Sequence, residues 1–401
     1  MTDTTAEIVV VGGGPAGLTA AIALAGAGIE TAIVAVPAAA HDNRTTALLA
    51  STVTALDTLG VWQRCADQAA PLKRMRLIDD TARLLRAPEV CFDSAEIGLP
   101  AFAHNIENRH LLAALEQRAR DIPALQVVAA KAERLDIGDA DVAVSLDNGK
   151  RVSARLAIAA DGRRSLCRTA AGIETDSRHY PQTALTFNLA HARPHGDTST
   201  EFHIESGPFT LVPLPGRRSS LVFVVNPADV MRLTAMAEAE LAEEIERRSH
   251  SLLGKVSIEA GRGVFPLTAE VARRFGQNRV VLIGEAAHVM PPIGAQGLNL
   301  GLRDAATIGE LVVAARCDGG DVGSDALTAR YEHMRRADVT SRSLAVDLLN
   351  RSLLSDFLPL HGVRGLGLYL LEQIGPLRRA VMREGVAPAA SQPRLMRGEA
   401  L

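Results

Sequence analysis

The spacing of apolar and polar positions predicts that the chain begins with a parallel α/β arrangement. Residues Ile8–Val11 are all apolar and β-branched, which is typical of a strand buried on both faces of a parallel sheet. Residues 18–25 are small or apolar over the length of a short helix, and residues 31–36 are apolar again. The order of strand, helix and strand predicts a βαβ unit with two parallel strands.

Glycines fill the turn between the first strand and the helix. Gly12, Gly14 and Gly17 form the pattern Gly-x-Gly-x-x-Gly. In such a turn, glycines allow a tight bend, close approach of the backbone to a pyrophosphate, and close packing of helix on strand. The positive end of the helix then faces the phosphate charge. Because the pattern stands between an apolar strand and a helix, it predicts dinucleotide binding more strongly than an isolated match would.

The second strand lacks a residue that dinucleotide folds usually carry. An Asp or Glu near the end of this strand normally binds the ribose hydroxyls. In this chain that place falls at about Ala35, while Glu30 comes too early and Asp42 lies in the following loop. We therefore expect either a missing ribose anchor or a substitute for it.

Composition and charge narrow the functional classes. The chain has 401 residues, of which 47% are hydrophobic, and a net charge of −3, so we expect a globular protein of two domains without nucleic-acid binding. Its four cysteines are scattered, which argues against a metal site or a disulfide framework and fits a reducing compartment. Residues 2–7 carry acids and no basic stretch, so we expect no secretory signal and a cytoplasmic location.

Later segments predict a second domain that is rich in β-strands. Residues 75–80 and 83–92 have the composition of a strand pair. Further strands are expected at residues 184–191, 199–205, 210–213 and 219–225. Between the two parts of the chain that form this domain, residues 156–160 predict another buried strand, which ends at Asp161-Gly162. Residues 47–59 and 109–119 predict helices, the second with Asn108 as its N-cap.

These segments define the expected domain organisation. The first domain comprises residues 1–72, 104–179 and 276–340, and the second, inserted domain comprises residues 73–103 and 180–275. A helical segment over residues 341–387 and a flexible tail over residues 388–401 complete the chain.

The most specific pattern lies between Arg279 and Asp304. It contains Gly-Glu-Ala-Ala-His at 284–288 and Pro-Pro-Ile-Gly-Ala-Gln-Gly-Leu-Asn at 291–299. Together with Arg-Thr-Thr-Ala-Leu at 44–48 and Asn-Ile-Glu-Asn-Arg at 105–109, it resembles the flavin-dependent aromatic hydroxylases. The similarity is greatest to the branch that hydroxylates the ring in ubiquinone biosynthesis, and it extends over most of the first 340 residues.

The resemblance implies a set of FAD contacts. Arg44 and Arg109 match arginines near the cofactor, although each could be an ordinary surface residue. Glu285 replaces the family's Asp that binds the ribityl chain, and the helix after Ala295 would direct amide donors at flavin N1 and O2. The implied cofactor-binding residues are Gly12, Gly14, Pro15, Ala16, Gly17, Arg44, Arg109, Asp161, Gly284, Glu285, Pro292, Gly294, Gln296, Gly297, Leu298 and Asn299. The pocket candidates are Tyr180, Gln182, His288, Pro291 and Pro292, and no catalytic base is assigned.

The resemblance also implies a fold and a reaction. The fold is α/β, with a Rossmann-like FAD-binding domain of the p-hydroxybenzoate hydroxylase type, an inserted mixed β-sheet substrate domain and a helical C-terminal segment. The electron donor that reduces FAD would be NADH, NADPH or a reductase, and it would bind only transiently. O2 would then form a C4a-hydroperoxyflavin that hydroxylates the ring of a polyprenyl phenol. Given the missing carboxylate near Ala35, we expect FAD to bind non-covalently and rather weakly.

Two alternatives stay open at this point. One is a flavin enzyme of the same fold, such as a reductase, that acts on another prenylated or aromatic substrate. The other is a non-catalytic FAD-binding accessory protein of a quinone-biosynthesis complex. The single Trp62 excludes the Trp-x-Trp-x-Ile-Pro motif of halogenases. Ring position, prenyl chain length, electron donor and oligomeric state do not follow from the sequence.

The C-terminal segment carries apolar residues at helical spacing. They are Val363, Leu366, Leu370 and Ile374, followed after Gly375-Pro376 by Leu377, Val381 and Met382. Arginines at 378, 379 and 383 lie beside the second group. The structural interpretation is that these helices pack on the FAD-binding domain. The alternative is peripheral contact with the inner face of a membrane, where a polyprenylated phenol would reside.

Overall fold

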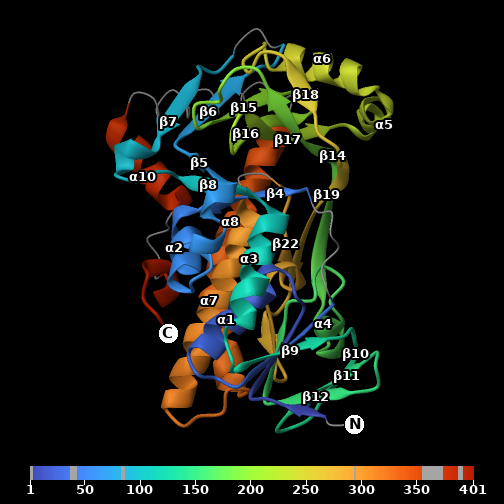
Figure 1. Ribbon diagram of the computed structural model, residues 1–401, viewed down its shortest axis with the longest axis vertical. Helices are drawn as coiled ribbons and strands as arrows, with labels where there is room; N and C mark the ends of the chain where they lie inside the picture. The colour runs from blue at the N-terminus through green and yellow to red at the C-terminus, as the bar shows by residue number, and fades with distance from the viewer. Residues whose placement is uncertain (1–2, 37–42, 83–85, 293–294, 355–373, 387–391) are drawn as a thin grey trace.

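The computed structural model describes residues 3–36, 43–82, 86–292, 295–354, 374–386 and 392–401, with side chains described except at 345–354 and 386 (Figure 1). Two large sheets organise it. A six-stranded sheet lies in the lower half of Figure 1, and a nine-stranded sheet lies in the upper half. Smaller sheets of four and three strands complete the arrangement.

The six-stranded sheet has the order β20-β21-β13-β2-β3-β9. Its strands are β2 (Ile8–Val11), β3 (Thr31–Ala35), β9 (Leu125–Ala129), β13 (Leu156–Ala159), β20 (Gly276–Gln277) and β21 (Val280–Leu282). The pairs β21–β13, β13–β2, β2–β3 and β3–β9 are parallel, which confirms the predicted parallel sheet. Every residue of β2, β13 and β21 is buried, because helices pack against the sheet.

Three helices pack together beside this sheet. They are α1 (Pro15–Gly26), α3 (Asn108–Arg120) and α7 (Gln296–Cys317). The four-stranded sheet extends the same domain with β1 (Thr4–Thr5), β12 (Arg151–Ala154), β11 (Val142–Leu146) and β10 (Ala132–Ile137), beside α4 (Leu166–Ala170). One hydrophobic core joins the two sheets and these helices.

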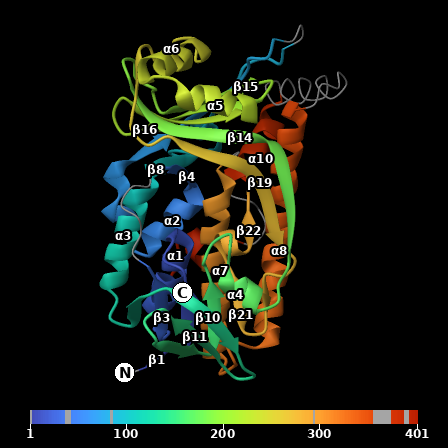
Figure 2. The ribbon, with the colours of Figure 1, turned by 90° about the vertical axis from the view of Figure 1, so that its right-hand side faces the viewer.

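The nine-stranded sheet has the order β22-β19-β14-β17-β16-β15-β6-β7, with β18 paired to β14. Its strands are β6 (Arg74–Asp79), β7 (Val90–Asp93), β14 (Thr175–His191), β15 (Thr198–Ile204), β16 (Gly207–Leu214), β17 (Arg218–Val225), β18 (Val256–Ile258), β19 (Gly263–Ala272) and β22 (His288–Val289). Figure 2 shows β14 and β19 running from this sheet toward α4. On one face, α5 (Pro227–Ala235) and α6 (Glu238–Arg248) cover a separate apolar core.

The remaining elements lie between the two large sheets. The three-stranded sheet contains β4 (Thr45–Leu49), β8 (Ala103–Glu107) and β5 (Ala69–Leu72), and α2 (Ala50–Thr58) follows β4 directly. The long helix α8 (Asp325–Leu354) packs on α7, and α10 (Gly375–Val386) contacts the short turn Ser94–Ile97 that follows β7. Val363, Leu366 and Leu370 of the expected apolar stripe lie outside the described residues. The division into two domains at the predicted boundaries stays our interpretation.

The structure corrects two local predictions around the three-stranded sheet. Residues 47–49 were expected to open a helix, but they belong to β4, which pairs with β8. Asn108 is the first residue of α3 rather than its N-cap, a position held by Glu107. The Asn108 side chain instead accepts a hydrogen bond from the Thr46 hydroxyl at 2.7 Å, which ties the start of α3 to β4.

The expected flexible tail is wrong for residues 392–401. Residues Arg394–Arg397 form a short 3-10 helix that contacts α2 and α7. Leu395 and Met396 are almost fully buried there, and the backbone N–H of Arg394 donates to Glu310 of α7 at 2.9 Å. The end of the chain is therefore packed on the first domain, because two apolar side chains enter its core.

Candidate functional site

Two cavities lie where the nine-stranded sheet faces the first domain. The larger one, of about 910 Å³, we call the basic cavity. Its charged lining residues are Arg44, Arg109, Arg163, Arg262 and Glu285. The second, of about 510 Å³, we call the apolar cavity. Both are lined by Thr45, Val222, Met290, Pro291 and Pro292, so the two cavities adjoin at the segment just before α7.

Five of the predicted cofactor-binding residues line the basic cavity. They are Pro15, Arg44, Arg109, Glu285 and Pro292. Pro15 opens α1, and Arg44 precedes β4 with its guanidinium 5.8 Å from the ring centre of Phe265. Arg109 is the second residue of α3 and donates to the buried carboxylate of Glu107 at 3.1 Å. Residues far apart in sequence thus meet around one space, as the predicted FAD site requires.

Two helix N-termini lack side-chain caps. No side chain caps α1 after Gly14 or α7 after Ala295, and neither helix has an acidic residue in its first turn. A Cβ atom added at Gly14 or Gly297 would meet no other atom within 4 Å, so open space lies in front of both backbones. Open N-termini of this kind bind phosphate and other anionic groups. These residues therefore fit the pyrophosphate and the flavin ring of FAD.

The other glycines of the first turn act by close packing. Gly12 has a φ of +118°, and an added Cβ would lie 2.2 Å from the carbonyl oxygen of Ala160. A Cβ at Gly17 would lie 2.1 Å from the carbonyl oxygen of Gly12. Both positions therefore require glycine, because any side chain would push α1 away from the sheet. A Cβ at Gly13 would likewise meet Ala35 at 2.6 Å, which places the end of β3 against this turn.

Three predicted contact residues are hydrogen-bonded within the protein instead. The carboxylate of Asp161 accepts from the Ser165 hydroxyl at 2.5 Å and from the backbone N–H of Cys167, which orders the turn before α4. Asn299 accepts from Leu49 N–H and donates to the carbonyl of Ala47, so it joins α7 to β4. The N–H of Gly284 donates to Asp304 at 3.0 Å. Gly294 lies outside the described residues.

The apolar cavity draws its walls from several separate segments. Its apolar lining includes Leu49, Leu72, Met75, Phe92, Phe102, Val212, Val222, Val381 and Met382. Its polar lining includes Asn105, Ser199, Glu201, Thr210 and Gln296. Gln296, Gly297 and Leu298 bring the start of α7 to the same space. An apolar cavity with a few convergent polar groups is the usual form of a site for an aromatic ligand.

Of the predicted pocket residues, Pro291 and Pro292 line both cavities, whereas Tyr180, Gln182 and His288 line neither. Gln182 is buried and donates to the carbonyl of Ser206 at 2.7 Å. The ring of His288 is fully buried, with Nε2 2.7 Å from Asp304. Gln182 and His288 are buried in the protein interior and Tyr180 is half-buried, so the described cavities do not support these three pocket assignments.

The buried pair of His288 and Asp304 extends to α8. Arg335 donates to the second carboxylate oxygen of Asp304 at 2.6 Å and also binds Asp338. Burial alone would raise the pKa of Asp304, but the charges of His288 and Arg335 hold it below its ordinary value. Arg342 then links Asp338 to the side chain of Gln296 at the start of α7. The network thus supports the segment that borders both cavities.

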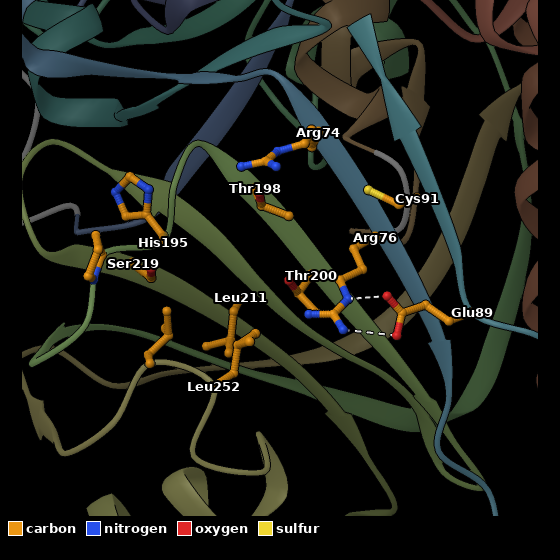
Figure 3. A pocket seen from close by; sticks show the side chains of 12 residues that line it. Arg74, Arg76, Glu89, Cys91, His195, Thr198, Thr200, Leu211, Ser219 and Leu252 are labelled. Carbon is orange, nitrogen blue, oxygen red and sulfur yellow. Dashed lines mark hydrogen bonds and ion pairs between the residues drawn. The ribbon is translucent and has the colours of Figure 1, made fainter.

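A third cavity, of about 350 Å³, lies on the opposite face of the nine-stranded sheet (Figure 3). Along β15, Thr198 and Thr200 line this cavity, whereas Ser199 and Glu201 line the apolar cavity. Figure 3 shows Arg76 paired with Glu89, and their nearest atoms are 2.6 Å apart. Because successive strand residues face opposite sides, the third cavity is separated from the other two by the sheet itself.

The sequence prediction missed most of the apolar cavity. The one available signal was the alternation of side chains between the two faces of a strand. Along β15 and β6 it places Ser199, Glu201 and Met75 on one face and their sequence neighbours on the outer face. It could not show which face meets the cofactor. The apolar spacing of Val381 and Met382 predicted a helix that packs on the protein, but it did not show that this helix reaches the substrate cavity.

Comparison with known proteins agrees with this geometry. The FAD binding domain family matches residues 5–343. The chain is 36% identical to the ubiquinone hydroxylase UbiL of Rhodospirillum rubrum, over 99% of this chain and 94% of that protein. It is 32% identical to the 3-demethoxyubiquinol 3-hydroxylase of Escherichia coli, over 96% of this chain and 99% of that protein.

A solved structure confirms the fold. The p-nitrophenol 4-monooxygenase of Pseudomonas putida has a TM-score of 0.78 at 20% identity, with 97% of this chain and all of that chain covered. The predicted architecture, an FAD-binding domain with an inserted β-sheet domain, is therefore correct. The protein is an FAD-dependent monooxygenase. The chain belongs to the flavin-dependent aromatic hydroxylases, in the branch of the ubiquinone-biosynthesis hydroxylases.

Proposed function

We propose that the chain hydroxylates the aromatic ring of a polyprenyl phenol in ubiquinone biosynthesis, with FAD in the basic cavity and the ring in the apolar cavity. The observation that carries this proposal is the shared border of the two cavities at Met290–Pro292, directly before the open N-terminus of α7. The names of the two relatives describe the same type of reaction for those proteins.

When bound, FAD supplies the reaction with O2, and this reaction delivers one oxygen atom to the ring. The protein holds the cofactor in place. Glu285 accepts from the ribityl hydroxyls, the first turn of α1 receives the pyrophosphate, and the N-terminus of α7 stabilises negative charge on the flavin ring. Pro291 and Pro292 separate the flavin from bulk water and set the distance to the substrate ring. The electron donor is NADH, NADPH or a reductase that binds transiently.

A single-turnover experiment tests this function without knowledge of the donor. The FAD-loaded protein is photoreduced without oxygen and then mixed with O2 and a short-chain prenylated phenol. We expect a product one oxygen atom heavier, detected by mass spectrometry. Reoxidation of the flavin with no product would support the accessory-protein alternative. A product with a saturated prenyl chain would support the reductase alternative.

We further propose that the outer face of α10 contacts an anionic membrane surface, from which the polyprenyl tail enters the apolar cavity. Leu377 and Val381 are exposed at helical spacing on this helix, and the exposed Ile374 directly precedes it. The opposite side of α10 is held down, because Arg378 binds Glu96 at 2.6 Å and stacks over Phe92. Such a helix can lie at an interface with its apolar face in the lipid. Within the described residues, no helix is both long enough and apolar enough to cross a bilayer.

Co-sedimentation with anionic liposomes tests the membrane contact. Leu377→Asp, at an exposed residue that does not line the apolar cavity, should lower liposome binding and the turnover of long-chain substrate several-fold while FAD binding is retained. The control is Met231→Asp, which changes an equally apolar, highly exposed residue on α5 far from the cavity. Removal of the chain after Pro359 is a less clean test, because it also removes the buried Leu395 and Met396. Equal sedimentation of the wild type and Leu377→Asp would exclude the contact.

A further inference from the structure

One ionisable side chain lines the apolar cavity. Among the described residues around this space, Glu201 alone carries a titratable group, and the others are apolar or neutral polar. Glu201 lies in the middle of β15, opposite Thr210 of β16. Its side chain keeps 20% of its surface exposed, so the carboxylate is accessible from the cavity. A charge in apolar surroundings is unfavourable unless it is paired, which makes its partners informative.

The carboxylate of Glu201 is hydrogen-bonded to a buried histidine. His203, two residues along the same strand, lies on the same side of the sheet. Its Nε2 is 2.7 Å from Oε1 of Glu201, and its side chain is only 5% exposed. The Thr210 hydroxyl donates to Oε2 at 3.4 Å, which is a long contact. One carboxylate oxygen is therefore firmly bound to a buried imidazole, while the other keeps capacity for a further hydrogen bond.

The same cavity is also lined by the segment to which we assign the flavin ring. Pro291, Pro292 and residues Gln296 to Leu298 line the apolar cavity together with Glu201. A phenol ring placed in this cavity would present its hydroxyl group to the available hydrogen-bond acceptors. Asn105, Thr210 and Gln296 can also hydrogen-bond a hydroxyl, but Glu201 is the group among the lining residues that can accept its proton.

We propose that Glu201 is a catalytic base that takes the proton from the ring hydroxyl of the substrate, with His203 as the positioning residue. This inference rests on the proposed function and deepens it. The substrate O–H bond breaks, a carboxylic O–H bond forms on Glu201, and the electron pair stays on the substrate oxygen. The resulting phenolate ring is richer in electrons and reacts more readily with an electrophilic oxygen atom. The proton returns to the same substrate oxygen before the product leaves, so no oxidant or reductant is consumed in this step.

The structural alternative is that the pair of Glu201 and His203 only stabilises the hairpin of β15 and β16. The two interpretations differ in what an isosteric change does. Glu201→Gln keeps the shape and can still hydrogen-bond His203, but it cannot accept a proton. A purely structural pair should tolerate this change with little effect on chemistry, whereas a base should not.

The experiment uses full-length, FAD-loaded Glu201→Gln and Glu201→Asp proteins. The matched control is Glu205→Gln, at the end of the same strand, whose carboxylate binds the N–H of Ala82 outside the cavity. Binding of a short-chain prenylated phenol is followed by the ultraviolet absorbance of its phenolate, and product formation is followed by mass spectrometry. Melting temperature and FAD occupancy verify that each variant is folded.

We expect the wild type and the control to ionise the bound phenol, and Glu201→Gln to lose the phenolate signal. The rate of product formation should fall about 100-fold in Glu201→Gln, at the lower end of the usual contribution of general base catalysis. KM should change little, and Glu201→Asp should restore part of the rate. His203→Gln should lower the rate while it leaves KM unchanged.

Two results would overturn the assignment in different ways. If the wild type makes product and folded Glu201→Gln makes it equally fast with the same phenolate signal, Glu201 is not the base and the proposed function stands. If the wild type makes no product from any prenylated phenol, the proposed function fails and the assignment of Glu201 fails with it.

Discussion

The two adjoining cavities are built in different ways. The basic cavity takes Pro15 from the glycine turn after β2 and Glu285, Pro291 and Pro292 from the segment after β21, and β14, β17 and β19 supply much of its remaining wall. The apolar cavity is formed by side chains from β4, β6, β7, β15, β16 and α10, each of which supplies only a few atoms. Backbone geometry restricts which residues can occupy a turn, whereas an apolar wall accepts many side chains of similar volume. The turns that border the cofactor cavity can therefore be predicted from the sequence. The substrate cavity cannot, because it depends on how distant segments meet.

The largest expected effect concerns the buried network behind the basic cavity. Asp338 accepts from Arg303, Arg335 and Arg342, and its replacement removes the carboxylate that pairs with Arg303 and Arg342, while Arg335 keeps its pair with Asp304. We expect Asp338→Asn to lower the free energy of unfolding by about 3 kcal/mol, as for other broken buried ion pairs. The control Asp229→Asn removes an exposed pair with Arg232 and should change it by less than about 1 kcal/mol. Urea denaturation measures both, and similar losses would contradict the assigned importance of the network.

The same network predicts the response to acid. Burial raises the pKa of Asp338, but the charges of Arg335 and Arg303 hold it well below its ordinary value in the folded protein. A carboxylate with a depressed folded pKa stabilises the protein fully above the unfolded value of about 3.9, and this stabilisation is lost as the pH falls below it. Wild-type stability should therefore fall more steeply below about pH 4 than that of Asp338→Asn. Parallel curves would show that Asp338 is not responsible.

The next prediction tests whether Glu285 binds FAD in the basic cavity. If its carboxylate accepts from the ribityl hydroxyls, Glu285→Ala loses a charge-assisted hydrogen bond worth about 1.5–3 kcal/mol. FAD affinity should fall by about 10- to 100-fold, and Glu285→Asp should be mild. Phenol binding to the apolar cavity should change little, which separates the two cavities. Titration with FAD followed by fluorescence checks this, and equal FAD occupancy of the wild type and Glu285→Ala would exclude the contact.

The smallest effect concerns the missing ribose anchor. Ala35 ends β3 beside the glycine turn, where the fold usually carries a carboxylate. Ala35→Glu should tighten FAD binding up to about tenfold, because one added charge-assisted hydrogen bond to the ribose is partly offset by the ordering of a long side chain. Isothermal titration measures the change. Tight FAD binding by the wild type with no gain in Ala35→Glu would mean that another group already anchors the ribose.

The features that could be predicted from the sequence lie mostly around the cofactor cavity rather than the substrate cavity. The parallel sheet, the glycine turn, the site at Glu285 and the segment before α7 were predicted, because each depends on a local pattern that only a few residues satisfy. Arg44 and Arg109, which the family resemblance assigned to the cofactor, both line the basic cavity, and their contact with FAD stays a prediction.

The errors have physical reasons as well. His288 follows a strand near the flavin segment, but its ring is drawn to a buried aspartate on α7, a pairing between distant residues. Residues 47–49 have helical composition, yet pairing with β8 makes them a strand, because tertiary contacts override local propensity. Glu201 was missed because a single acid in a strand usually faces solvent. Only the packing of the sheet onto the first domain turns it toward a cavity.

The most direct test of the central claim is the profile of quinone intermediates in cells that lack this protein. Mass spectrometry of lipid extracts should show a prenylated phenol or quinol that lacks one ring oxygen atom, together with less ubiquinone. Expression of the wild type should restore the normal profile, and Glu285→Ala should restore it poorly. An unchanged quinone profile in the deletion strain, or full rescue by a protein that binds no FAD, would contradict the account.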